Sequence, residues 1–185
     1  DAPMEVEDED EDEDDDELME QLEDEILDGD IDVFGLENVC DRGDGEPLFA
    51  RFAFEDWVLL SLRFEVHLLV HAVKRDSADK ERRGIQLEHL PFYYGKFYRK
   101  LLNPRSYGVE GVAEVMGLID DTVAVVAGIV EPQVPGEVHS NDIFVRLAEE
   151  DRRFRQRRVD GGDASAEVRL FGRAPERDPD APTCP

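Results

Sequence analysis

The sequence predicts a mainly α-helical domain with a short β element, preceded by a disordered acidic tail and followed by a flexible C-terminal segment. Residues 1–46 hold 24 of the 47 acidic residues and a single base, so this stretch carries −23 of the formal net charge of −26. Apolar residues in 52–119 and 141–159 recur at helical spacing. Between them, TVAVVAGIV is rich in β-branched residues, which is typical of a strand.

The acidic tail and its linker are assigned to residues 1–46. From Glu5 to Glu17 every residue except Val6 is acidic, and repulsion at that density prevents a packed core. The segment ELMEQLEDEIL, residues 17–27, repeats apolar residues at helical spacing and predicts a short, marginal amphipathic helix. The Gly- and Asp-rich stretch 28–47 then predicts a linker.

The folded part, residues 47–160, is predicted to open with three helices. The first is long and buried, and it ends at the charged loop 76–84. The second carries an apolar stripe and is stopped by Asn103-Pro104, and the third covers residues 110–119. The apolar faces of the three helices are Trp57, Val58, Leu62, Leu69 and Val73; Leu87, Leu90, Tyr94, Phe97, Tyr98 and Leu101; and Val112, Val115, Met116 and Ile119.

The C-terminal part is predicted to hold a strand, a fourth helix and a flexible end. TVAVVAGIV, residues 122–130, is expected to form one strand. The helix begins with Asn141 as N-cap and stops before Gly161-Gly162. Acid-to-base pairs at i, i+4, Glu149 with Arg153 and Asp151 with Arg155, are expected to stabilise it. Residues 166–171, AEVRLF, are expected to form a last strand within the flexible segment 161–185.

Several protein classes are excluded by composition and motifs. No run reaches the roughly 18 apolar residues of a membrane span, and the acidic N-terminus is unlike a signal peptide. Two cysteines make neither a disulfide framework nor a metal cluster, so we expect an intracellular protein, cytoplasmic or nuclear. His67 and His71 have zinc-ligand spacing without the HExxH glutamate and predict a structural pair rather than a metal site. Phosphate-loop, dinucleotide and nucleophile-elbow motifs are missing, so we expect a non-enzyme without a cofactor.

The order of three helices and a strand is the skeleton of a winged helix-turn-helix. Within it, the segment LEHLPFYYGKFYRKLLNPRSYGVEGVAEVMGLIDDTVAVV resembles the OST-type helix-turn-helix, or LOTUS, domain. The counterparts are the aromatic-rich helix 93–101, the turn at Tyr107-Gly108-Val109, the short helix 112–118 and the strand entry 121–123. The resemblance covers about residues 58–130. It implies a winged-helix-like three-helix core with an added C-terminal helix, acting as a non-catalytic RNA-associated module in a larger protein.

The candidate RNA-binding residues lie in and after the second helix. Lys96, Arg99 and Lys100 occupy i, i+3 and i+4 and would share one helical face, followed by Arg105. Such a face can contact an RNA backbone, and Tyr98 and Tyr107 can stack on unpaired bases, with G-rich RNA implied by the resemblance. The alternative is a solvated basic face whose tyrosines belong to the core.

The third helix, in the recognition position, argues against sequence-specific DNA binding. It carries Glu110 and Glu114, is followed by Asp120-Asp121, and contains no base. A major-groove reader needs donors for base edges and cations near phosphates.

The fourth helix is the candidate partner-binding element. Extended LOTUS domains carry a helix there that docks onto a Vasa-type DEAD-box helicase, which would use Ile143, Phe144, Leu147, Phe154 and Arg155 here. The alternative is a structural helix stabilised by its own ion pairs. Two other functions stay open: a protein-interaction module whose acidic tail binds basic proteins, and a structural subunit of a large assembly. One hypothesis for the tail is that it folds back onto the basic clusters at 96–105 and 152–158; the alternative is a solubilising tail that contacts neither.

Overall fold

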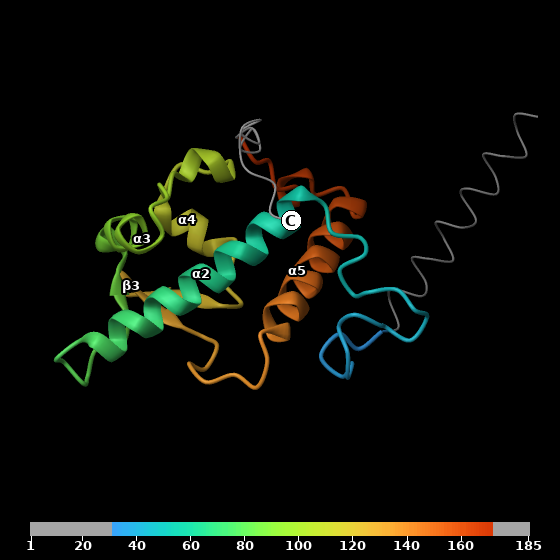
Figure 1. The fold of residues 1–185 in the computed structure, drawn as a ribbon. Helices are drawn as coiled ribbons and strands as arrows, with labels where there is room; N and C mark the ends of the chain where they lie inside the picture. The colour runs from blue at the N-terminus through green and yellow to red at the C-terminus, as the bar shows by residue number, and fades with distance from the viewer. Residues whose placement is uncertain (1–30, 172–185) are drawn as a thin grey trace, which may run out of the picture.

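The computed structural model describes residues 31–171 (Figure 1). The predicted acidic run and the helix at 17–27 lie outside the described residues. The described chain is mainly helical, as predicted, and its β element is a small antiparallel sheet. None of the described helices is both long and apolar enough to cross a membrane. The elements are α2 (Phe54–Asp76), β1 (Ile85–Gln86), η1 (Leu87–His89), α3 (Leu90–Tyr98), η2 (Pro104–Tyr107), α4 (Val112–Gly117), β2 (Val123–Val126), β3 (Ile129–Pro132), α5 (Asp142–Asp160) and η3 (Ala164–Ala166).

The long helix α2 is the axis of the domain, with α3, α4 and the sheet on one side and α5 on the other (Figure 1). Its first turn is closed by the Asp56 carboxylate, which accepts a hydrogen bond of 2.7 Å from the Ala53 backbone N–H. Trp57, predicted on the buried face, is 44% exposed. The core residues that α2 contributes are Leu59, Leu62, Val66, Leu69, Val70 and Val73.

The prediction of one strand at 122–130 is wrong, because this stretch forms a hairpin. Ala127 and Gly128 connect β2 to β3 with φ angles of 50° and 76°. Two consecutive residues in this conformation form the turn that matches the twist of a two-residue hairpin. β1 pairs with the other edge of β3, giving the antiparallel order β1-β3-β2.

Helices α3 and α4 are both shorter than predicted. The apolar stripe predicted α3 to continue to Leu101, but Arg99 adopts a left-handed conformation (φ 57°) and its N–H donates to the Gly95 carbonyl. This C-cap turns the chain away, so Leu101 leaves the core and is exposed. Phe97, still within α3, was also predicted on the buried face and is exposed. α4 begins two residues later than expected and ends at Gly117.

Residues 31–47, predicted as part of a linker, instead pack against α5 together with Leu48. Their apolar side chains form a small buried cluster: Val33, Val39 and Leu48, with Leu36 and Val145 against it. Arg146 Nη1 donates to the Val33 carbonyl at 2.7 Å, and Arg153 Nη1 to the Ile31 carbonyl at 3.1 Å. The linker prediction was wrong because the Asp- and Gly-rich composition hides a few spaced apolar residues. These residues pack against α5, a contact that composition alone does not reveal.

Helix α5 begins and ends as predicted, and the chain after it is also packed. The Asp142 N–H is capped by the Ser140 hydroxyl and not by the Asn141 side chain. The last strand predicted at 166–171 does not form. Ala166 is buried, Val168 packs against the main core, and the Phe171 N–H donates to the Ser106 carbonyl at 3.1 Å. Residues 163–171 are therefore a strap over the core and not part of a flexible end.

Candidate nucleic-acid interface

The three bases predicted to share one face of the second helix do not lie on a common helical face. Lys96 lies in the last turn of α3, Arg99 is its left-handed cap, and Lys100 follows the helix. Lys100 Nζ forms an ion pair with Glu65 Oε1 on α2. The i, i+3, i+4 argument fails because the helix ends before the second of its three bases.

Three of the four predicted bases nevertheless remain available to an anion. Lys96, Arg99 and Arg105 are exposed. Within residues 31–171, no carboxylate lies at ion-pair distance from any of these three side chains. Arg105 is placed by η2, where its backbone N–H donates to the Asn103 side chain at 3.2 Å. These three residues are termed the basic α3 segment below.

The two predicted stacking tyrosines belong to the core instead. Tyr98 Oη donates a hydrogen bond of 2.7 Å to the Glu65 backbone carbonyl, and its ring lies 5.2 Å from that of Tyr94. The Tyr94 hydroxyl donates to the Glu65 carboxylate. Burial, together with the charge of Glu65, raises the pKa of Tyr98 and of Tyr107. The alternative interpretation of these tyrosines, as core residues, is therefore the one that the contacts favour.

Two phenylalanines of α3 are exposed in place of the tyrosines. Phe92 is 65% exposed and Phe97 is 51% exposed. Lys96 Nζ lies 6.0 Å from the centroid of the Phe92 ring, so a base and an aromatic face are presented together. Sequence reasoning placed Phe97 in the apolar stripe and did not single out Phe92. The signal was available, since aromatic residues at 92, 93, 94, 97 and 98 exceed what one buried face of a nine-residue helix can accommodate.

The second basic cluster, on α5, is neutralised by carboxylates of the same chain. Glu149, which is buried, accepts from Arg152 and from Arg153, each at 2.7 Å. The predicted i, i+4 pairs Glu149–Arg153 and Asp151–Arg155 are both present. Arg157 and Arg158 also have carboxylate partners, at 3.8 and 2.5 Å. This cluster is therefore a stabilising network and offers little free positive charge.

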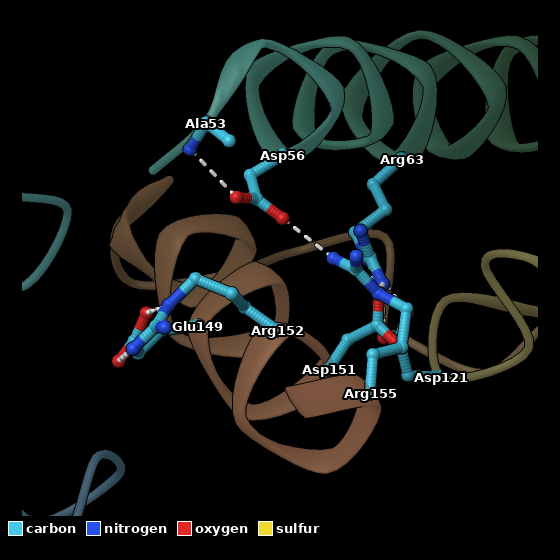
Figure 2. Close-up of polar contacts among 8 residues, drawn as sticks. All are labelled: Ala53, Asp56, Arg63, Asp121, Glu149, Asp151, Arg152 and Arg155. Carbon is cyan, nitrogen blue, oxygen red and sulfur yellow. Dashed lines mark hydrogen bonds and ion pairs between the residues drawn. The ribbon is translucent and has the colours of Figure 1, made fainter. Parts of the chain in front are cut away.

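A buried arginine that sequence reasoning missed joins α5 to the rest of the domain (Figure 2). Arg63, in α2, is 1% exposed. Its guanidinium donates to both carboxylate oxygens of Asp121, with Nη2–Oδ2 at 2.8 Å, and its Nη2 lies 3.0 Å from Asp151 Oδ2 on α5. One step along the same interface, Arg155 Nη2 contacts Asp56 Oδ1 at 2.5 Å. The only sequence signal was a single arginine in the otherwise largely apolar stretch 57–70 of α2.

The predicted partner-binding residues of α5 divide into two groups. Phe144 is buried, with its ring 5.5 Å from that of Phe64 and 5.0 Å from that of His67. Like Arg155, it holds α5 against α2 and is not presented outward. Ile143 and Leu147 are half-buried. Phe154 is 52% exposed, with the Arg158 guanidinium 5.7 Å from its ring.

The histidine pair has the environment of a core contact. The rings of His67 and His71 lie 4.5 Å apart, and His71 Nε2 lies 3.0 Å from the Val134 carbonyl oxygen. Burial, with the nearby His71 charge, lowers the pKa of His67 to about 4. In the described part of the chain, no three His, Cys, Asp or Glu residues gather in a way that could hold a metal ion.

The acidic residues around α4 are also used within the fold. Asp121 is bound to Arg63, and Glu114 Oε2 accepts a hydrogen bond of 3.1 Å from the Glu110 N–H. The basic α3 segment, and not α4, carries the positive charge of this part of the domain. Comparison with family models, with curated proteins and with solved structures gives no match to this chain.

Proposed function

We propose that this domain is a winged-helix-like, non-catalytic module that binds single-stranded RNA through α3 and the chain leading to η2. The observation that carries the proposal is the contrast between the two basic clusters. The arginines of the α5 cluster at 152–158 are paired with carboxylates, whereas Lys96, Arg99 and Arg105 are exposed and have none within residues 31–171. Cations without internal partners are the groups that phosphate can engage without breaking an existing ion pair.

The fold supports the proposal at the level of topology. The order α2-β1-α3-α4-β2-β3, with an antiparallel sheet in the order β1-β3-β2, is the arrangement expected of a winged helix. The LOTUS-like motif in the sequence follows the same order of elements. The β2–β3 hairpin would be the wing, with Val125 and Val126 partly exposed on it.

Single-stranded RNA fits this surface better than duplex DNA. Phe92 and Phe97 offer exposed rings for stacking on unpaired bases, and Lys96 stands beside one of them. The short helix α4 offers no base to a major groove, and Glu110 just before it and Glu114 within it would repel phosphate. The helicase partner and the G-rich preference stay predictions that follow from the family resemblance.

The test is a salt series of RNA affinities. The full chain is titrated with a fluorescent single-stranded RNA, and the variant Lys96→Glu, Arg99→Glu, Arg105→Glu is compared with it. We expect weaker binding and a shallower dependence of log K on log salt. The slope should fall by about 2, since each lost single-strand phosphate contact removes about 0.7.

The matched control makes three equivalent charge reversals elsewhere, with Lys74→Glu and Arg75→Glu in the last turn of α2 and Lys80→Glu in the loop after it. This control should retain most of the affinity if the site is the basic α3 segment. Equal losses in the two triple variants would show binding by net charge alone, and no binding by the unaltered chain would reject RNA as the ligand. A parallel titration of Phe92→Ser with Phe97→Ser tests stacking, which is worth about 1–3 kcal/mol per base.

A further inference from the structure

A cavity of about 500 Å³ lies beside the N-terminal end of α3, next to the proposed RNA contacts. It is lined by the loop after α2, by β1, by the start of α3 and by the start of β3. Cavities of this size are typical of sites for small aromatic groups and cofactors. This cavity is termed the α3 pocket.

The backbone around the α3 pocket is held by contacts to β3 and the hairpin. Gly84 packs so closely on β3 that a Cβ there would lie 1.9 Å from the Val130 carbonyl oxygen. The Leu87 N–H donates to the Gly128 carbonyl at 2.9 Å, and Arg82 Nε donates to the Gly84 carbonyl at 3.0 Å. The walls of the pocket are therefore formed before a ligand binds.

The carboxylates and guanidinium groups that line the α3 pocket balance one another. Two are acidic, Asp79 and Glu81, and two are basic, Arg82 and Arg83. Arg83 Nη1 also lies 3.3 Å from Glu131 Oε1. Because these charges cancel, the pocket is a poor phosphate site, in contrast to the basic α3 segment. A neutral aromatic group such as a nucleobase suits it better.

Gln86 and Tyr93 are the lining residues with which a nucleobase can interact most specifically. The half-buried Tyr93 packs against the main core, so its ring is a fixed aromatic wall. In β1, Ile85 is buried and Gln86 is exposed, so the Gln86 side chain points away from the core. Within residues 31–171 the Gln86 amide has no hydrogen-bond partner. Its acceptor oxygen and its donor NH₂ group are therefore both available to a ligand.

The α3 pocket is continuous with the proposed RNA surface. The Tyr93 ring lies 5.5 Å from the Phe92 ring, and Lys96 Nζ lies 6.0 Å from the centroid of Phe92. Tyr93 and Lys96 are three residues apart, or about 4.5 Å along the helix axis. An RNA strand that contacts Lys96 and stacks on Phe92 therefore lies beside the pocket and can place the next base in it.

We propose that the α3 pocket binds one unpaired adenine of the RNA strand. A glutamine amide pairs with adenine at two points, because its oxygen accepts from N6 and its NH₂ group donates to N7. The Tyr93 ring provides the stacking surface. This inference rests on the proposed function. It makes Gln86 the residue that specifies the base, whereas the basic α3 segment only positions the strand.

The test compares nine-nucleotide RNAs that differ at one base. The full chain is titrated at low salt with fluorescent oligouridine and with the same RNA carrying a central adenine or a central guanine. We expect the adenine RNA to bind about 5- to 10-fold more tightly than oligouridine. This is the lower part of the range for a two-point contact, since Gln86 is exposed to solvent. A central 7-deazaadenine, which lacks the N7 acceptor, should lose most of that gain.

The variant Gln86→Ala should bind the adenine RNA no more tightly than oligouridine. Its affinity for oligouridine, and the salt dependence of that affinity, should equal those of the unaltered chain, because the phosphate contacts remain. The matched control is Gln133→Ala, which removes an exposed glutamine that follows the far end of β3 and lies outside the pocket. This control should keep the preference for adenine.

Three results would overturn the adenine pocket while oligouridine binding still supported the proposed function. They are equal affinities for oligouridine and the adenine RNA, a preference that survives Gln86→Ala or 7-deazaadenine, and tighter binding of the guanine RNA. The last result would instead support the G-rich preference that follows from the family resemblance.

If the chain binds none of the RNAs, the proposed function fails and the pocket is scored with the mononucleotide alone. Adenosine 5′-monophosphate at millimolar concentration should shift the NMR signals of the Gln86 side-chain amide and the Gly84 backbone amide, whereas uridine 5′-monophosphate should not. Unshifted signals, or equal shifts with both nucleotides, would overturn the adenine pocket as well.

Discussion

Replacing Arg63 with Met should destabilise the fold more than any surface change. The substitution removes a buried guanidinium and leaves Asp121 and Asp151 facing each other without their shared cation. Removing one partner from a buried ion pair costs about 3–5 kcal/mol. The Asp121 and Asp151 side chains retain 23% and 20% of their exposure, so solvent relieves part of this cost. We therefore expect about 3 kcal/mol in the free energy of unfolding.

The assay is urea denaturation of the full chain, followed by circular dichroism. With a slope of about 1.5 kcal/mol per M, the midpoint of Arg63→Met should fall by about 2 M. Adding Asp121→Asn and Asp151→Asn to Arg63→Met should recover part of the loss, because it removes the unpaired charges. Arg157→Met, which affects an exposed pair with Glu150 at 3.8 Å, should cost less than about 0.5 kcal/mol. A loss below about 1 kcal/mol for Arg63→Met would refute the reasoning.

Two other predictions concern pH and backbone conformation. The pKa of His67 is about 4 in the folded chain and 6.5 in the unfolded chain, so between these values the unfolded chain binds one more proton. The free energy of unfolding should therefore fall as the pH drops from about 6.5 to 4, by at most about 3 kcal/mol. In urea titrations at several pH values, His67→Leu should lose this pH dependence, whereas His139→Gln, at an exposed position, should keep it. The same pH dependence of stability in the unaltered chain and in both variants would contradict the assignment. Gly108→Ala should cost about 1–3 kcal/mol, because φ is +74° and a Cβ would lie 2.2 Å from the Arg169 carbonyl oxygen. Gly117→Ala in α4, where a Cβ meets nothing within 4 Å, should instead stabilise by about 0.5–1 kcal/mol.

The helical elements could be predicted because their signals are local. The spacing of apolar residues located α2 and α5, and Asn141-Asp142 with Gly161-Gly162 marked both ends of α5 within a residue. The hairpin was missed because Ala127-Gly128 is a weaker turn signal than Asn-Gly, within a continuous run of β-branched residues. The end of α3 was missed because residues 99–101 continue the helical pattern, and only the return of the chain toward Glu65 requires the left-handed Arg99.

The candidate site shows the same division between local and long-range information. Lys96, Arg99 and Arg105 were selected from the sequence, since exposed bases need no partner to be recognised. Which aromatic rings remain accessible was not predictable, because Tyr98 is turned inward by a carbonyl of α2, 33 residues away in the chain.

The sequence by itself determined the acidic N-terminal composition, the helical class of the domain and the positions of its two basic clusters. These properties depend on residues that are close together in the chain. Only the tertiary structure decided the long-range ion pairs that join the elements, with Asp56 bound to Arg155 across 99 residues and Arg63 to Asp121 across 58. An ion pair between two elements forms only where those elements pack together, and this packing is decided by the burial of the whole core and not by neighbours in the sequence.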